Sequence, residues 1–142
     1  MWDTLEFDAM QATSNATIND PTSPLILIVD DDDSLANMLK SAMEENGYRT
    51  QTARDGNEGL AIAESKSPDL IILDIMMPRR SGFLVLERLC QMLENPIPVV
   101  IVTGNLGERH RSYAEMLGVS GYFYKPVKMS VVLDRVNELL GD

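Results

Sequence analysis

Residues able to do phosphoryl chemistry each follow an apolar run of the sequence. Asp30 and Asp31 follow the first run and Asp74 a later one, whereas Thr103 and Lys125 end two further runs. Carboxylates that converge on one place repel one another unless a cation lies among them. Oxygen ligands of this kind select a hard ion, so the residues predict a magnesium site that could bridge to a phosphoryl group.

Asp74 is central in this set and is the best candidate for a carboxylate nucleophile that forms an aspartyl phosphate. The Lys125 ammonium and the Thr103 hydroxyl would contact the phosphoryl oxygens. A simpler interpretation must be weighed, because an aspartate after a strand is often only the N-cap of a helix. We prefer that interpretation for Asp33 or Ser34. The combination of residues at four predicted strand ends is much more specific than any one of them.

Short apolar runs alternate with amphipathic stretches of helical period, a pattern typical of repeated βαβ units. The predicted strands cover residues 25–30, 48–53, 70–74, 97–102 and 121–124. The predicted helices include Leu35–Met43, Asn57–Ser65, Leu86–Leu93, Glu108–Leu117 and Val132–Leu140. We therefore expect an α/β fold in which five helices cover both faces of an open parallel sheet of five strands. In such sheets the functional site lies beyond the carboxyl ends of the strands.

Residues 25–140 resemble the receiver domain of two-component response regulators. The motifs that carry the resemblance are Ile28-Val29-Asp30-Asp31-Asp32, Leu73-Asp74-Ile75-Met76-Met77-Pro78 with Gly82, Val102-Thr103-Gly104 and Tyr122-Phe123-Tyr124-Lys125-Pro126. The resemblance implies a flavodoxin-like, doubly wound sheet with strand order 2-1-3-4-5. Residues 1–24 contain four acidic and no basic residues and end in a stretch rich in Ser, Thr, Asn, Asp and Pro, so their composition predicts a tail or linker before a receiver domain over residues 25–142.

The resemblance assigns a metal and its ligands. It implies Mg²⁺, with Mn²⁺ as an alternative, bound directly by Asp31 and by Asp74, the phosphorylated aspartate. Asp30 would hold the metal through water, and the backbone carbonyl of Met76 would be the third protein ligand. The Met76 side chain would flank the phosphoryl group and, by screening water, could lengthen the phosphorylated lifetime.

Further residues are assigned to phosphate binding and switching. Thr103 matches the switch hydroxyl, Lys125 the phosphate-binding lysine, and Tyr122 the aromatic residue that changes rotamer on activation. The bond between Lys125 and Pro126 matches a cis peptide of the family.

The implied function is that of a signalling phosphoacceptor rather than an enzyme with its own substrate. A sensor histidine kinase or a histidine phosphotransfer protein would present a phosphohistidine, which Asp74 would attack. The face made by the fourth helix, the fifth strand and the fifth helix would then change state. Because the chain ends soon after the fifth helix, we expect output through a partner protein or through self-association as a homodimer, unless the sequence is a fragment.

Composition limits the alternatives. The chain of 142 residues has a net charge of −10, the wrong sign for binding nucleic acid or anionic lipid over its bulk surface. One cysteine, Cys90, cannot form an internal disulfide, and we interpret it as a small buried hydrophobe. The N-terminus has no signal-peptide pattern, so we expect a cytoplasmic protein with no membrane partner.

Two rival functions remain open. The first is a constitutive interaction module that is never phosphorylated, against which the intact set of acidic, threonine and lysine residues argues. The second is a magnesium-dependent phosphatase with an aspartate nucleophile. Such enzymes usually carry a second acid two residues after the nucleophile, where this chain has Met76.

Overall fold

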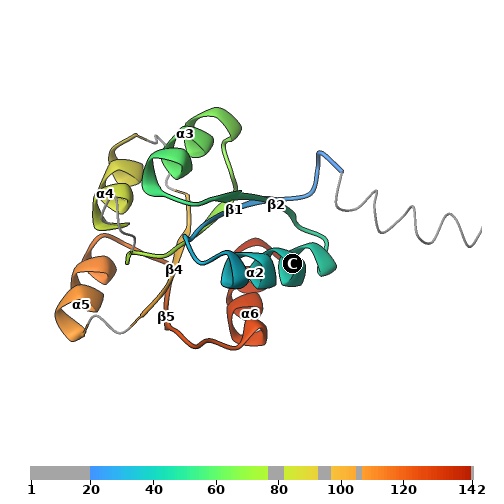
Figure 1. The fold of residues 1–142 in the computed structure, drawn as a ribbon. Coiled ribbons are helices and arrows are strands. Elements are labelled where there is room, and N and C mark those ends of the chain that lie inside the picture. Colours follow the sequence, from blue (N-terminus) through green and yellow to red (C-terminus); the bar gives the residue numbers. More distant parts are fainter. Residues whose placement is uncertain (1–19, 77–81, 93–96, 105–106, 142) are drawn as a thin grey trace, which may run out of the picture.

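The computed structural model describes residues 20–76, 82–92, 97–104 and 107–141. A parallel sheet with strand order β2-β1-β3-β4-β5 runs through the centre of the molecule (Figure 1). Its strands are β1 (Leu25–Val29), β2 (Arg49–Ala53), β3 (Leu70–Leu73), β4 (Val99–Thr103) and β5 (Gly121–Tyr124). The predicted fold class and strand order are confirmed.

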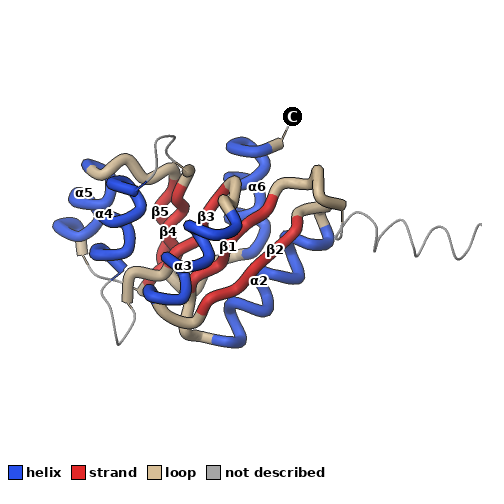
Figure 2. The backbone as a smooth tube through the Cα atoms, turned by 90° about the horizontal axis from the view of Figure 1, so that it is seen from above, coloured by secondary structure: helices blue, strands red, loops and turns tan. Residues whose placement is uncertain are grey.

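Five helices cover the two faces of the sheet. They are α2 (Asp33–Glu45), α3 (Gly56–Lys66), α4 (Gly82–Met92), α5 (Glu108–Met116) and α6 (Met129–Leu140). Figures 1 and 2 show α3, α4 and α5 on one face and α2 with α6 on the other. Among the described residues, none of the helices combines the length and the apolar character that a membrane span requires.

The hydrophobic core has two halves, one on each face of the sheet. Every residue of β1, β3 and β4 is buried, as expected of central strands covered on both sides. The edge strands differ, since β2 exposes much of its length and β5 is half-buried. Their more polar or aromatic sequences correspond to this thinner cover.

Helix α2 begins at a side-chain cap. The carboxylate of Asp32 accepts a hydrogen bond from the backbone N–H of Leu35 at 3.2 Å, which satisfies one of the free donors of the first turn. The preference for Asp33 or Ser34 as the cap was therefore wrong. Both are helical, and Asp33 instead forms an exposed ion pair with Arg54.

Helix α4 corrects the interpretation of the single cysteine. Leu86 and Leu89 are buried against the sheet, but Cys90 is exposed. Its Sγ lies 3.7 Å from the carbonyl oxygen of Leu117. A residue next to the apolar stripe of a helix can fall on either side of the boundary, and here the buried stripe is narrower than the sequence suggested.

Candidate functional site

The carboxyl ends of β1, β3, β4 and β5 meet at one edge of the sheet and bring the predicted residues together. Asp30 follows β1, Asp74 follows β3, Thr103 ends β4 and Lys125 follows β5. Asp30 and Asp74 are each 3% exposed and Thr103 is fully buried. Burying polar groups is costly without partners, so each of these side chains must be held by hydrogen bonds or by opposite charge.

The carboxylate of Asp74 is held on both of its oxygens. Oδ1 accepts hydrogen bonds from the Thr103 hydroxyl at 2.9 Å and from the Met76 backbone N–H at 2.8 Å. Oδ2 lies 3.0 Å from the ammonium of Lys125. Three donors from three different segments therefore fix the orientation of one buried carboxylate.

Lys125 joins the two buried carboxylates. Its ammonium lies 3.1 Å from Asp30 Oδ2 as well as close to Asp74. Burial opposes the charged form of Lys125, but its bonds to Asp74 and Asp30 outweigh this effect and raise its pKa. The backbone carbonyl of Thr103 accepts a bond from the Lys125 N–H at 2.7 Å, which fixes the start of the loop after β5. The peptide bond between Lys125 and Pro126 is cis.

The pKa of Asp30 is perturbed by its surroundings. Burial raises its pKa to about 6, and the neighbouring Asp74 charge adds to the rise. The backbone N–H of Asp32, at 2.9 Å from Asp30 Oδ1, and the Lys125 ammonium oppose it. For Asp30, burial therefore outweighs the stabilisation of the carboxylate by Lys125 and by the Asp32 N–H.

Asp31 completes an acidic cluster suited to a divalent cation. One carboxylate oxygen from each of Asp30, Asp31 and Asp74 lies within 4.8 Å of the other two, and Asp31 alone is exposed. The three carboxylates and one ammonium carry a net charge of −2, which a divalent ion would neutralise. Oxygen ligands open to solvent on one side suit Mg²⁺, which retains several waters. The donor set therefore fits this metal.

Two glycines shape the rim of the site. Gly82, at the start of α4, packs so closely on Ile75 that an added Cβ would overlap the Ile75 backbone. Gly104 is less confined, because among the described residues an added Cβ would meet the Met76 thioether alone, at 3.2 Å. The Met76 side chain is 51% exposed, so it lies over the rim rather than in the core. Its role in screening water stays a prediction.

Tyr122, the predicted switch residue, is buried on the α5 side of the sheet. It is 8% exposed, and its hydroxyl has no hydrogen-bond partner among the described residues. Burial raises the pKa of this hydroxyl, and the nearby Arg111 cation opposes the rise. Tyr124 packs edge-on against the Tyr122 ring at 5.4 Å between ring centroids.

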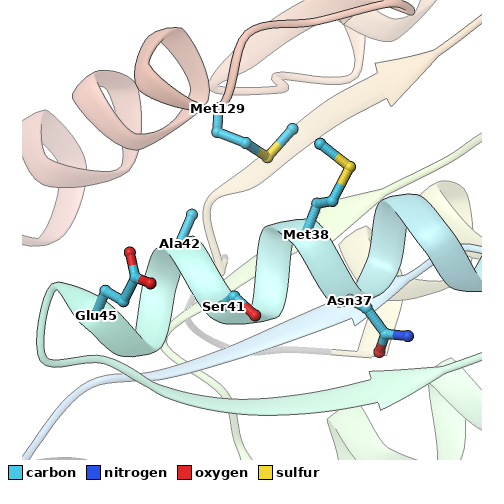
Figure 3. Close-up of a pocket in the computed structure, with 6 residues that line it drawn as sticks. All are labelled: Asn37, Met38, Ser41, Ala42, Glu45 and Met129. Carbon is cyan, nitrogen blue, oxygen red and sulfur yellow. The ribbon is translucent and has the colours of Figure 1, made fainter.

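A shallow apolar groove leads away from the site along α2. One part lies between α2 and the loop after β5, and the other continues toward the start of α6. The two parts are lined by Asp32, Ser34, Leu35, Met38, Lys125, Pro126 and Val127, and by Asn37, Met38, Ser41, Ala42, Glu45 and Met129. Figure 3 shows the Met38 and Met129 thioethers pointing toward one another across it. Met38 is 54% exposed and is common to both parts.

Residues 26–137 match the sequence model of the family described as "Response regulator receiver domain". The chain belongs to this family. Such receiver domains are signalling phosphoacceptors of two-component systems and bind Mg²⁺ at an acidic pocket. The structure of this receiver has an acidic cluster made by Asp30, Asp31 and Asp74.

Two regulators illustrate the relationship. The receiver is 36% identical over 115 residues to the alkaline phosphatase synthesis transcriptional regulatory protein PhoP of Bacillus subtilis, covering 81% of this chain and 48% of PhoP. It is 34% identical over 116 residues to protein PilH of Pseudomonas aeruginosa, covering 81% of this chain and 96% of PilH. The chain thus spans about half the length of the transcriptional regulators it matches, but nearly all of PilH.

Solved structures agree with this assignment. A CheY-like response regulator receiver domain protein from Methanospirillum hungatei JF-1 is 30% identical, with a TM-score of 0.78. The similarity covers 84% of this chain and 94% of that one.

Sequence reasoning placed the side chains of this receiver better than its backbone contacts. It brought Asp30, Asp31, Asp74, Thr103 and Lys125 to one edge, and the structure places them there. The Met76 N–H was not indicated as a donor, because every residue type except proline carries a backbone N–H. Residues 1–19 of the predicted tail, and Met77 and Pro78 of the motif around Asp74, lie outside the described residues.

Proposed function

We propose that this receiver accepts a phosphoryl group from a phosphohistidine onto Asp74. The observation that carries the proposal is the Asp74 carboxylate itself, which is buried yet ionically paired and held on both oxygens by Thr103, Met76 and Lys125. A nucleophile fixed in this way meets the reacting phosphorus with little loss of orientational freedom.

The two oxygens of Asp74 have different roles in the proposed reaction. Oδ1 accepts two bonds from uncharged donors, whereas the contact of Oδ2 within the described part of the chain is with the Lys125 ammonium. Oδ2 attacks phosphorus, so that a new O–P bond forms as the P–N bond to the donor imidazole breaks. The imidazole leaves with the electron pair of that bond and takes a proton from solvent. Lys125 then moves from the carboxylate to a phosphoryl oxygen and neutralises its charge.

Asp31 and Asp74 would bind Mg²⁺ directly, Asp30 would hold it through water, and the backbone carbonyl of Met76 would be a further ligand. The bound ion would supply positive charge to the phosphoryl oxygens as negative charge develops on them. Without such an ion, three neighbouring carboxylates would repel an anionic phosphodonor.

Transfer would alter the contacts of Thr103. Its hydroxyl, bonded to Asp74 Oδ1 in the unmodified protein, would turn to a phosphoryl oxygen. In the sheet register Thr103 pairs with Tyr124 and Ile101 pairs with Tyr122, so a shift at the end of β4 reaches both tyrosines. We propose α5, β5 and α6 as the output face, which would control a partner protein or self-association.

The phosphodonor would be a sensor histidine kinase or a histidine phosphotransfer protein. A protein that delivers a phosphohistidine must approach the edge of the sheet that carries Asp74. The groove along α2 begins there, at Asp32 and Lys125, and is apolar around Met38. We propose that a donor helix packs on it, while residues 1–24 act as a tail or linker outside the 25–142 domain.

The proposed function is tested by incubating the protein with Mg²⁺ and acetyl phosphate and measuring intact mass. We expect one added phosphoryl group that is labile to hydroxylamine, maps to the peptide containing Asp74, and is lost without Mg²⁺. Asp74→Asn is the matched control and should gain no such group. A folded wild-type protein that binds Mg²⁺ but is never phosphorylated would favour the constitutive interaction module instead.

A further inference from the structure

Arg111 contacts both tyrosines of the edge strand β5. Its guanidinium carbon lies 5.6 Å from the centroid of the Tyr122 ring and 5.9 Å from that of Tyr124. Both distances are within the range of cation–π attraction. Arg111 is held in turn by Glu115, one helical turn along α5, at 3.4 Å. A single cation therefore bridges α5 to the two aromatic side chains of β5.

Tyr122 needs such a partner in its buried position. The residue is 8% exposed, and its hydroxyl is buried without a hydrogen bond among the described residues. Leaving a buried hydroxyl unpaired disfavours this position relative to an outward one in which water would solvate the group. Burial of the ring in the hydrophobic core offsets part of that cost, and the Arg111 cation over the ring face adds to this offset.

We propose that Arg111 is a positioning residue that holds Tyr122 buried before any phosphoryl group is bound. When Arg111 is present, β5 is biased toward the buried-tyrosine arrangement. Loss of the cation frees Tyr122 to turn outward, where its hydroxyl gains water.

The same contact reaches the phosphoacceptor. Tyr124, the second aromatic partner of Arg111, pairs in the sheet with Thr103, whose hydroxyl binds Asp74. Arg111 on the outside of the domain is thus linked through one strand pair to the proposed site of phosphorylation. This consequence rests on the proposed function. The effect of Arg111 on Tyr122 does not, because it concerns the unphosphorylated protein.

The test is ¹⁹F NMR of the full chain labelled with 3-fluorotyrosine, with Tyr122 assigned by Tyr122→Phe. The solvent isotope shift between H₂O and D₂O reports the exposure of the ring. In Arg111→Gln we expect the Tyr122 signal to gain isotope shift, with the ratio of buried to exposed rings falling about two- to fivefold, as suits one partly exposed cation–π contact. Arg111→Lys keeps the cation and should restore most of the wild-type shift.

Arg109→Gln is the matched control, since Arg109 is an exposed residue of the same helix and its loss changes the net charge equally. An unchanged Tyr122 signal in folded Arg111→Gln would overturn the proposal. So would an equal change in Arg111→Lys or in Arg109→Gln. Because no phosphodonor is added, failure here is distinguishable from failure of phosphorylation at Asp74.

Discussion

The edge of the sheet that carries Asp30, Asp31 and Asp74, the acidic edge, is flanked by α2 and by α5. These two flanks are built differently. On the α2 flank, the helix is capped by Asp32, buries Ala36, Leu39 and Met43, and packs on the fully buried strand β1. On the α5 flank, the helix begins at Glu108, its N-cap position is Gly107 with no side-chain hydrogen bond, and Ala114 is its one buried residue. It faces the half-buried strand β5.

From this difference we infer that the β1 and β3 side positions the reacting groups and that the α5 side changes conformation. The chemistry needs fixed atoms, and the carboxylates that supply them follow the well-anchored strands β1 and β3. A conformational change that a partner can recognise needs an element with few buried contacts, because such elements open or shift at low free-energy cost. We therefore expect changes near β1 and β3 to be costly, and changes on α5 to alter conformation with little loss of stability.

Gly82→Ala should give the largest effect. Its Cβ would overlap the Ile75 backbone and lie 2.8 Å from Ile75 Cβ, so the segment after β3 must shift. We expect a loss of about 3 kcal/mol in the free energy of unfolding, measured by urea denaturation. Gly104→Ala is the control, because the Met76 thioether, at the end of a flexible side chain, is the one described group that its Cβ would meet, and it should change stability by less than about 0.5 kcal/mol. Equal losses in both variants would contradict the inference that the backbone after β3, at Ile75, cannot easily move.

Lys125→Ala should be the next most costly change in the absence of metal. It leaves Asp30 and Asp74 buried without their counter-charge, for a loss of about 2 kcal/mol at pH 7.5. The value is at the lower end for a buried pair because Lys125 is 24% exposed. Saturating Mg²⁺ should recover part of the loss. A variant as stable as wild type without metal would show that the lysine is not balancing the acids.

Met38→Glu should separate partner docking from chemistry. The variant places a charge in the apolar groove, so we expect transfer from a phosphorylated histidine phosphotransfer protein to slow about tenfold. Labelling by acetyl phosphate, which needs no docking surface, should be unchanged. Lys40→Glu, an exposed change on the same helix, is the control. Equal slowing with the phosphotransfer protein and with acetyl phosphate would show that the groove is not where the donor protein docks.

Mg²⁺ affinity should fall as the pH is lowered, because Asp30 then takes up a proton. Its pKa is raised to about 6, so protons compete with the metal below that value and affinity should drop by up to about tenfold per pH unit. The pH dependence of stability in the metal-free protein has the opposite direction, because the protonated carboxyl of Asp30 is the form that burial favours. Its contribution to stability is full below about pH 4 and is lost as the pH rises through about 6. Titrations in Asp30→Asn should be flatter in both respects.

Asp32→Ala should give the smallest effect, about 1 kcal/mol, through loss of the α2 cap. Asp32→Asn keeps the acceptor while removing the charge and should retain most of that stability. Urea denaturation of the two variants distinguishes capping from charge. If both variants lose the same amount of stability, the cap of α2 does not account for the stability of this flank.

The acidic edge could be predicted because parallel strands bring their carboxyl ends together, so Asp30, Asp74, Thr103 and Lys125 must converge. The cap of α2 could not, because Asp32, Asp33 and Ser34 are all good capping residues and the choice depends on where the chain leaves β1. The contacts of Arg111 with β5 were also missed. They depend on how α5 packs, and Arg111 and Tyr122 are too far apart in sequence for any periodicity to relate them.

The most direct test of the two-flank account is hydrogen exchange with and without phosphorylation. The protein would be incubated with Mg²⁺ and acetyl phosphate, with occupancy measured by intact mass and Asp74→Asn as control. We predict altered exchange in residues 107–124, which contain α5 and β5, and little change in residues 25–45, which contain β1 and α2. Equal changes in both segments, or none in residues 107–124 at full occupancy, would contradict the account.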